Sequence, residues 1–192
     1  MSEQIILASN SPRRRELLTQ LGVNYIVRPV DTDETPLEDE LPLDYVQRVA
    51  AEKSALCASL TEIDLPILAA DTAVVLDNHI MGKPENQQHA AQMLSLLSGK
   101  THQVYSALSF RGKQHWQVVN ITNVTFRNIK PTEMAAYWQT GEPQDKAGGY
   151  AIQGLGSIFI KSINGSFSGV MGLPLFETAE LLAKQGIQII HE

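Results

Sequence analysis

The stretch Ile5-Ile6-Leu7-Ala8-Ser9-Asn10-Ser11-Pro12-Arg13-Arg14-Arg15-Glu16-Leu17-Leu18 combines a buried strand, a tight turn and the start of a helix. Four apolar residues predict the strand, and Ser9 to Ser11 predict the turn. Pro12 suits the first helical position after Ser11 as N-cap, and Gly22 is expected to end the helix. A strand that leads directly into a helix indicates an α/β fold, which we expect to form one domain over residues 1–192.

Three arginines, Arg13 to Arg15, occupy the first turn of this helix. A helix N-terminus carries partial positive charge and normally favours acids. The mismatch disappears if an anion binds the turn through backbone N–H groups, serine hydroxyls and a guanidinium, and phosphate is the obvious candidate. The alternative is that the arginines only solvate a helix end, and this stretch alone leaves both interpretations open. It is not a Walker A loop, because the glycines and the Gly-Lys-Ser/Thr ending are missing.

Composition limits the classes of protein to consider. A chain of 192 residues with 43% hydrophobic content can bury a substantial core. Fifteen Lys and Arg against 21 Asp and Glu give a net charge of −6, so the surface as a whole is not a nucleic-acid footprint. The single cysteine, Cys57, excludes an internal disulfide and a multi-cysteine zinc site. No apolar run approaches membrane-spanning length. We therefore expect a cytoplasmic protein without nucleic-acid or membrane partners.

Two charged residues interrupt apolar patterns. Lys53 lies on the apolar stripe of a helix expected from about Pro42 to Ala58, with Leu43, Val46, Val49, Ala50, Leu56 and Cys57. Its ammonium group either extends past the apolar surface to reach water or binds an anion in a cleft. Asp71 interrupts the strand-like run from Ile67 to Leu76, where a carboxylate is costly unless it is paired, hydrogen-bonded or bound to metal. Asp71 is therefore a candidate site residue.

The remaining elements follow from turn residues and periodicity. The pattern predicts a strand over 23–30, a solvated acidic loop over 31–40, a hairpin at Asp77-Asn78 leading to Lys83, a helix over 86–97, a hairpin of 104–110 with 118–127, a helix over 131–139, a last hairpin of 157–163 with 167–170, and a final helix that ends before Gly186. A glycine-rich segment, 145–156, lets backbone pass close to a ligand and offers Lys146, Tyr150 and Gln153 as polar contacts. Taken alone, it also fits an ordinary loop.

Several short motifs, in this order, resemble the Maf family of nucleoside triphosphate pyrophosphatases. They are Ser9-Asn10-Ser11-Pro12-Arg13-Arg14, Asp33-Glu34-Thr35, Ala70-Asp71-Thr72, Gly82-Lys83-Pro84, Asp145-Lys146-Ala147-Gly148 through Gly154, and Gly172-Leu173-Pro174. The resemblance spans nearly the whole chain. It implies a mixed, elongated sheet flanked by helices, with two lobes around a central cleft, similar to inosine triphosphate pyrophosphatases. It also implies hydrolysis of a nucleoside triphosphate to the monophosphate and pyrophosphate, with Mg²⁺ or Mn²⁺ as cofactor.

The resemblance implies roles for individual residues. Asp71 resembles the proton acceptor, and Glu34 would join Asp71 as an oxygen ligand for the metal ion. Lys53 and Lys83 would face the phosphates. Ser9, with Arg13 or Arg14, would complete the phosphate cradle, while the three-arginine run leaves open which of Arg14 and Arg15 matters.

The segment from Asp145 to Gly154 resembles the branch of the family that acts on dTTP and UTP. Arg13, Thr72 and Gln153 match the positions that the resemblance assigns to substrate specificity, and Lys146 lies in the same segment. The Gln153 amide offers both a donor and an acceptor to the imide edge of thymine or uracil. A homodimer is common in such families.

Two other classes of function stay open at this point. A nucleotide-binding regulator of septum formation would keep the phosphate cradle without needing Asp71. A nucleic-acid-binding protein would use the arginine cluster on phosphates, but the acidic net charge and the buried carboxylate argue against it.

Overall fold

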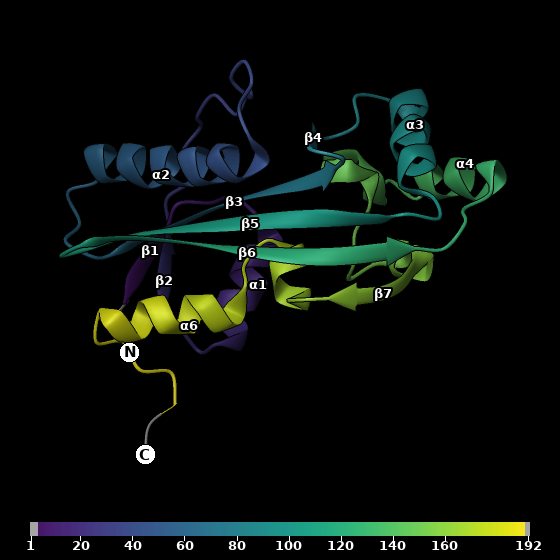
Figure 1. The fold of residues 1–192 in the computed structure, drawn as a ribbon. Coiled ribbons are helices and arrows are strands. Elements are labelled where there is room, and N and C mark those ends of the chain that lie inside the picture. The colour runs from purple at the N-terminus through teal and green to yellow at the C-terminus, as the bar shows by residue number, and fades with distance from the viewer. Residues whose placement is uncertain (1–3, 191–192) are drawn as a thin grey trace.

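A computed structural model describes residues 4–190, which form one seven-stranded sheet with helices on both faces (Figure 1). The strands are β1 Ile5–Leu7, β2 Tyr25–Val27, β3 Ile67–Leu76, β4 His79–Met81, β5 Thr101–Arg111, β6 His115–Phe126 and β7 Ile160–Asn164. The α-helices are α1 Pro12–Gln20, α2 Pro42–Leu60, α3 Gln87–Leu97, α4 Pro131–Gln139, α5 Phe167–Met171 and α6 Leu175–Lys184; three 3₁₀ turns are η1 Glu142–Asp145, η2 Ala147–Gly149 and η3 Leu155–Phe159. The expected mixed, elongated sheet flanked by helices is confirmed.

The sheet is parallel at one end and antiparallel elsewhere. Its order is β2-β1-β3-β5-β6-β7, with β4 paired to β3 beside this path. β1 runs parallel to both β2 and β3, whereas the pairs from β3 through β7 are antiparallel. The long strands β3, β5 and β6 run between two groups of helices, with α2 and α6 at one end and α3 and α4 at the other (Figure 1). These groups are the two lobes.

One edge of β3 opens in its middle. β5 pairs along one edge from Ile67 to Val75. On the other edge, β1 pairs with Ile67 and Leu68 and β4 pairs with Val74 to Leu76. Among the strands of residues 4–190, none pairs with 69–73 on that second edge. Side chains and ligands can approach the sheet where two strands part from a third, and Asp71 lies at the centre of this gap.

Alternation along β3 sends neighbouring residues to opposite faces. Ala73 and Val75 pack against α2 with Tyr45, Val46, Val49 and Ala50, and Asp71 shares their face. Thr72 therefore faces the other side, where α5 packs. Burial of a valine such as Val46 or Val49 stabilises the fold by about 1.5–3 kcal/mol, so this helix is held firmly on the face of the sheet that carries Asp71.

The opening strand, turn and helix form as predicted. β1 is fully buried, and Ser11 is the N-cap position of α1, although its side chain makes no capping hydrogen bond within the described residues. Gly22 adopts a φ of 70°, the left-handed conformation that ends a helix without strain at glycine. The hairpin turn at Asp77-Asn78 is also confirmed, with φ of 49° and 65°.

The last predicted hairpin is wrong. β7 pairs with β6, whereas residues 167–171 form the short helix α5. Gly165 does form a turn after β7, with a φ of 135°, but the Ser166 side chain then accepts from Gly169 N–H and caps a helix. Gly172 ends this helix with a φ of 106°. A serine cap followed by a terminating glycine therefore outweighs the apolar alternation that favoured a strand.

Smaller differences concern exposure and length. Leu43, predicted on the buried stripe of α2, is 41% exposed, because the inward face of the helix runs through Pro42, Tyr45, Val46 and Val49 and leaves position 43 outside it. β2 is shorter than the predicted strand because β1 offers only Ile5 to Leu7 as partners.

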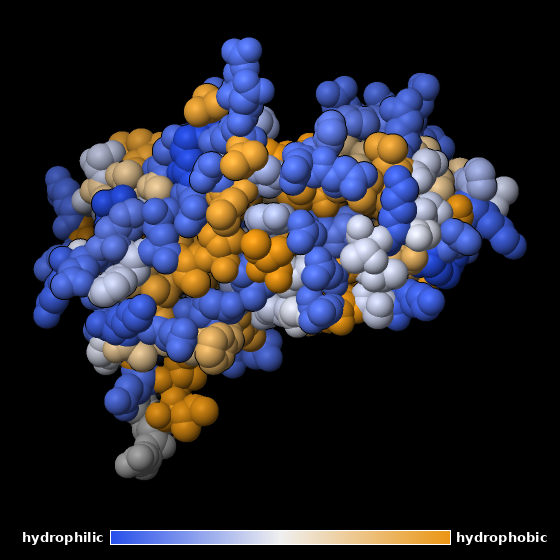
Figure 2. Space-filling view, viewed as in Figure 1, coloured by the Kyte–Doolittle hydropathy of each residue, from blue (hydrophilic) through white to orange (hydrophobic). Residues whose placement is uncertain are grey.

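In residues 4–190 no helix is long and apolar enough to cross a membrane. On the face shown in Figure 2, hydrophobic residues gather over the middle of the sheet, and hydrophilic residues surround them.

Candidate functional site

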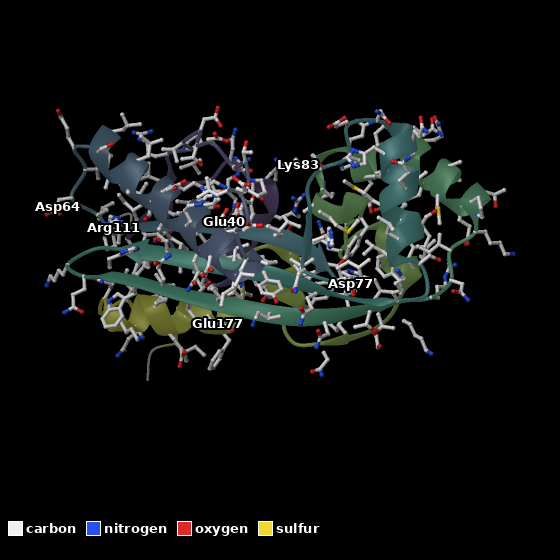
Figure 3. All side chains as sticks on the ribbon, turned by 45° about the horizontal axis from the view of Figure 1, so that its top comes forward. Glu40, Asp64, Asp77, Lys83, Arg111 and Glu177 are labelled. Carbon is white, nitrogen blue, oxygen red and sulfur yellow. The ribbon has the colours of Figure 1, made fainter. Side chains whose placement is uncertain are left out.

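A cleft of about 370 Å³ opens at the unpaired edge of β3. Its lining includes every predicted site residue: Ser9, Arg13, Arg14, Glu34, Lys53, Asp71, Thr72, Lys83, Lys146 and Gln153. They come from the turn after β1, the start of α1, the acidic loop, α2, β3, the loop after β4 and the glycine-rich segment. The sequence places these residues far apart, and the fold brings all of them to one cavity. Figure 3 shows Lys83 between the lobe with α2 and the lobe with α3.

Lys53 joins two carboxylates on the floor of the cleft. Its Nζ lies 2.9 Å from Asp71 Oδ1 and 2.6 Å from Glu34 Oε1. Both Lys53 and Asp71 are buried, at 8% and 5% exposure, so this contact is shielded from bulk water. Within residues 4–190 the second oxygen, Asp71 Oδ2, is buried and has no hydrogen-bond partner. A buried carboxylate oxygen without a donor is costly and indicates a position meant for a ligand.

Glu34 is held ionised beside this pair. Burial acts to raise the pKa of Glu34, but the hydrogen bond from Lys53 and the charges of Lys53, Lys83 and Arg14 outweigh it and lower the pKa. The prediction that residues 31–40 form an irregular loop is confirmed, and the Glu34 side chain reaches from it into the cleft while staying 44% exposed.

Two residues of α2 hold the loop that carries Glu34. Tyr45 Oη donates to the Glu34 carbonyl oxygen at 2.9 Å. Arg48 binds Glu40 through two parallel bonds of 2.6 and 2.7 Å and donates to the Thr35 carbonyl oxygen at 3.2 Å. Sequence reasoning missed this role. Glu40 lies eight residues before Arg48 in the sequence, but their pairing depends on how the loop folds back onto α2.

Arg14 connects three segments beneath the cleft. It donates to Ser9 Oγ at 3.1 Å, Thr72 Oγ1 at 3.4 Å and the Gly172 carbonyl oxygen at 2.8 Å. Ser106 Oγ lies 2.9 Å from Thr72 Oγ1 and donates its one proton to the Gly169 carbonyl oxygen at 2.6 Å. Thr72 is therefore the donor to Ser106 and the acceptor from Arg14. Arg14 thus fixes the turn after β1 against β3 and α5.

The other two arginines of the run separate. Arg13 lines the cleft, and its Nη1 lies 3.7 Å from Asp145 Oδ2 on the opposite wall. Asp145 also contacts the ammonium of Lys146. Arg15 instead donates to the Asn10 carbonyl oxygen at 3.4 Å and does not line the cavity. The structure therefore brings Arg13 and Arg14 to the cleft and leaves Arg15 outside. Asp145 was not singled out from the sequence, although it stands beside Lys146 in the glycine-rich segment.

Glycines bring the second wall close to β3. Gly148 N–H donates to the Gly82 carbonyl oxygen at 3.0 Å, which joins the glycine-rich segment to the loop that carries Lys83. Gly148 has a φ of 68°, and a Cβ there would lie 2.9 Å from a methyl group of Val74. Only glycine permits this close approach of the segment to β3. The expected approach of this backbone to a ligand stays a prediction.

The donor set suits a hard divalent cation held jointly with a ligand. Residues 4–190 contain no group of three or more His, Cys, Asp or Glu residues that could hold a metal ion alone. Mg²⁺ commonly uses one or two carboxylates, with water and substrate phosphates completing its shell. Glu34 and Asp71 share one ammonium, and Asp71 Oδ2 has no other partner among the described residues, so these two residues fit that pattern.

Comparison with known proteins assigns the chain to a family. Residues 4–185 match the family of Maf-like proteins, and the chain belongs to this family. A relative from Methylococcus capsulatus, named dTTP/UTP pyrophosphatase, is 53% identical over 185 residues, which cover 96% of this chain and 92% of the relative. A relative from Pseudoalteromonas translucida with the same name is 49% identical over 183 residues, covering 95% and 97%.

One solved structure shows a weaker similarity. The Ham1 protein of Staphylococcus aureus aligns with a TM-score of 0.47 and 15% sequence identity, over 65% of this chain and 72% of that protein.

Proposed function

We propose that this protein hydrolyses dTTP and UTP to the nucleoside monophosphate and pyrophosphate. The observation that carries the proposal is the buried Oδ2 of Asp71, which has no hydrogen-bond partner among residues 4–190, in a cleft lined by Arg13, Lys53 and Lys83. A triphosphate needs such cations, and an attacking water needs such an acceptor. The names of the relatives, dTTP/UTP pyrophosphatase, support the same reaction and substrates.

In the proposed reaction, water attacks the α-phosphorus. Asp71 Oδ2 accepts the proton of the water as the new phosphorus–oxygen bond forms, and the bond from the α-phosphorus to the bridging oxygen breaks to release pyrophosphate. Lys53 keeps the Asp71 carboxylate oriented through Oδ1, which leaves Oδ2 for the water. Lys83 and Arg13 neutralise charge that develops on the phosphate oxygens. Arg14 would hold the shape of the phosphate site, because its N–H groups donate to Ser9, Thr72 and Gly172.

Glu34 and Asp71 would hold the cofactor, Mg²⁺ or Mn²⁺. When bound, this ion supplies positive charge beside the phosphates and draws electron density from them. The Lys53 ammonium contacts both carboxylates, so it reduces the repulsion between the negative charges of Glu34 and Asp71.

Gln153 would select the base. Its side chain lines the cleft from the wall that carries Lys146, opposite the turn after β1. An amide can donate to a carbonyl oxygen and accept from the imide N–H of thymine or uracil. A cytosine base would leave these groups unsatisfied, which lowers its kcat/KM.

The test is a panel of nucleoside triphosphates assayed with and without Mg²⁺ or Mn²⁺. Pyrophosphate and monophosphate are measured separately, and we expect both from dTTP and UTP. Hydrolysis in ¹⁸O-water should place the label in the monophosphate, because water attacks the α-phosphorus. Orthophosphate as the product, label in pyrophosphate, or no turnover of any nucleotide would contradict the proposal.

The proposal also covers the location, partners, domain organisation and assembly of the enzyme. A cytoplasmic location is supported by the single cysteine, Cys57, which is free and buried. A nucleotide rather than a nucleic acid as partner is supported by the net charge of −6. Residues 1–192 would act as one domain, supported by a sheet that joins β1 to β7. A homodimer is the proposed assembly, and light scattering would measure it.

A further inference from the structure

The segment that carries Gln153 has little regular structure of its own. Ala151 and Ile152 are buried, whereas Gln153 is exposed and lines the cleft. Gly154 N–H reaches the Ala151 carbonyl oxygen at a long 3.4 Å, which closes a loose turn around Gln153. The position of the Gln153 side chain therefore depends on what holds the backbone before and after this turn.

Tyr137, near the end of α4, holds the backbone before the turn. Its Oη accepts from Ala151 N–H at 3.1 Å and donates to Glu142 Oε1 at 2.6 Å. The ring packs edge-to-face on Phe159, with 5.1 Å between centroids. The tyrosine is buried, so its hydroxyl is fixed by packing as well as by hydrogen bonds.

Glu142, at the start of η1, holds the backbone after the turn. Its Oε2 accepts from Leu155 N–H at 2.9 Å, and its Oε1 accepts from Gly156 N–H at 3.0 Å. Burial acts to raise the pKa of Glu142, but the hydrogen bonds from Tyr137, Gly156 and Leu155 outweigh it and lower the pKa. The carboxylate is therefore ionised at neutral pH. Charge-assisted hydrogen bonds of this kind are stronger and shorter than neutral ones.

The backbone around Gln153 is shaped to receive these two side chains. A Cβ on Gly154 would overlap the Glu142 carboxylate, and a Cβ on Gly156 would lie 2.6 Å from Tyr137 Oη. Glycine at both positions lets the carboxylate and the hydroxyl reach the amides on either side of Gln153. Neither Tyr137 nor Glu142 lines the cleft, so neither would touch a nucleotide bound there.

We propose that Tyr137 and Glu142 are positioning residues that set the base preference of the enzyme by fixing Gln153 at the cleft wall. The inference rests on the proposed function and deepens it. Gln153 would meet the base, and the Tyr137–Glu142 pair, defined by these two residues, would fix the angle at which the amide meets it. Loss of the pair lets Gln153 move, so the contacts that discriminate thymine from cytosine weaken more than the contacts with the triphosphate.

The test measures a ratio that a purely structural role would leave unchanged. Both dTTP and dCTP are assayed on one preparation, and the ratio of their kcat/KM values does not depend on the folded fraction. Glu142→Gln replaces one acceptor oxygen with a donor that faces a backbone N–H, and Tyr137→Phe removes only the hydroxyl. Each variant is expected to lower the ratio by about tenfold, since specificity of this size follows from misplaced polar groups.

Glu133→Gln is the matched control. Like Tyr137, Glu133 lies on α4. It binds Arg127 through bonds of 2.8 and 3.0 Å and accepts from Lys130 N–H at 2.9 Å, and within the described residues it makes no hydrogen bond or ion pair with 150–156. We expect a fall in Tm without a change in the ratio. The Gln153→Ala background provides the second control, because adding Glu142→Gln there should change the ratio by less than about twofold if the carboxylate acts through Gln153.

Each result has a defined meaning. A wild-type ratio in both Glu142→Gln and Tyr137→Phe would overturn the inference, as would an equal fall of the ratio in Glu133→Gln or an undiminished fall in the Gln153→Ala background. Tyr137→Phe keeps the ring packed on Phe159, so it tests the inference even if Glu142→Gln does not fold. Absence of pyrophosphate release by the wild-type protein would instead refute the proposed function, and the inference with it.

Discussion

Replacement of Asp71 by asparagine separates catalysis from folding at this site. The side chain keeps its size in a position that is only 5% exposed, so packing in the middle of β3 is preserved. Lys53 keeps Glu34 at 2.6 Å as an ionic partner, and the new amide oxygen can accept from Lys53 in place of Asp71 Oδ1. We therefore expect a change in the free energy of unfolding of only about 1 kcal/mol.

The effect on turnover should be much larger. Asp71 Oδ2 is the atom proposed to accept the proton of the attacking water, and an amide cannot accept it. Removal of a general base typically lowers the rate by about 10²–10⁴-fold, which corresponds to roughly 2.7–5.5 kcal/mol of activation free energy. Loss of one of the two carboxylates proposed to hold the metal ion adds to this, so kcat should approach background.

The assay is pyrophosphate release from dTTP, with thermal unfolding measured on the same protein. Asp77→Asn is the matched control, because Asp77 lies outside the cleft at the β3–β4 turn (Figure 3) and asparagine tolerates its φ of 49°. The control should keep wild-type kcat/KM. A folded Asp71→Asn protein with kcat/KM within about threefold of wild type would refute the role of Asp71 as proton acceptor.

Further outcomes can be measured with the same assays. Lys83→Ala should lower kcat/KM for every nucleotide, because it removes charge from the triphosphate site, and an unchanged value would return Lys83 to a structural role. Gln153→Glu should change the ranking among dTTP, UTP, CTP and GTP, since a carboxylate cannot donate to the base. Arg48→Ala should raise the Mg²⁺ concentration needed for half-maximal activity, because it frees the loop that carries Glu34. An equal rise in that concentration when Arg48→Ala is added to Glu34→Gln would contradict this explanation. Burial lowers the pKa of His102 from 6.5 to about 4, so between these pH values the unfolded chain binds more protons than the folded one. The free energy of unfolding should therefore fall, by at most about 3 kcal/mol, as the pH is lowered from about 6.5 to about 4. His102→Gln should flatten this dependence in urea unfolding.

The sequence alone predicted the residues that line the candidate cleft, some from a family resemblance and two because they contradict their local pattern. Asp71 within an apolar strand and Lys53 on an apolar helix stripe each imply a partner, and the structure places them 2.9 Å apart. Local signals also located the strand–turn–helix of β1 and α1 and the hairpin at Asp77-Asn78, because capping and turn geometry depend on neighbouring residues. Glu34 was different, since only a family motif distinguished it from its acidic neighbours.

Contacts between distant segments were decided by tertiary structure alone. Local signals could not divide Arg13, Arg14 and Arg15 into two cleft residues with different partners and one residue outside the cleft, because that division depends on Asp145, Gly172 and Asn10 meeting the start of α1. The same holds for β7, whose partner is β6 rather than the segment that follows it.

The cleft itself is the clearest case. Local periodicity shows that β3 is a buried strand, and every buried strand needs partners for its backbone groups. Nothing local shows that β1 and β4 share one edge of β3 and leave 69–73 open between them. The sequence by itself thus determined which residues need a partner, because burial of charge is costly wherever it occurs. Only the tertiary structure decided which partners they meet, because the pairing of strands far apart in the chain sets where the sheet opens.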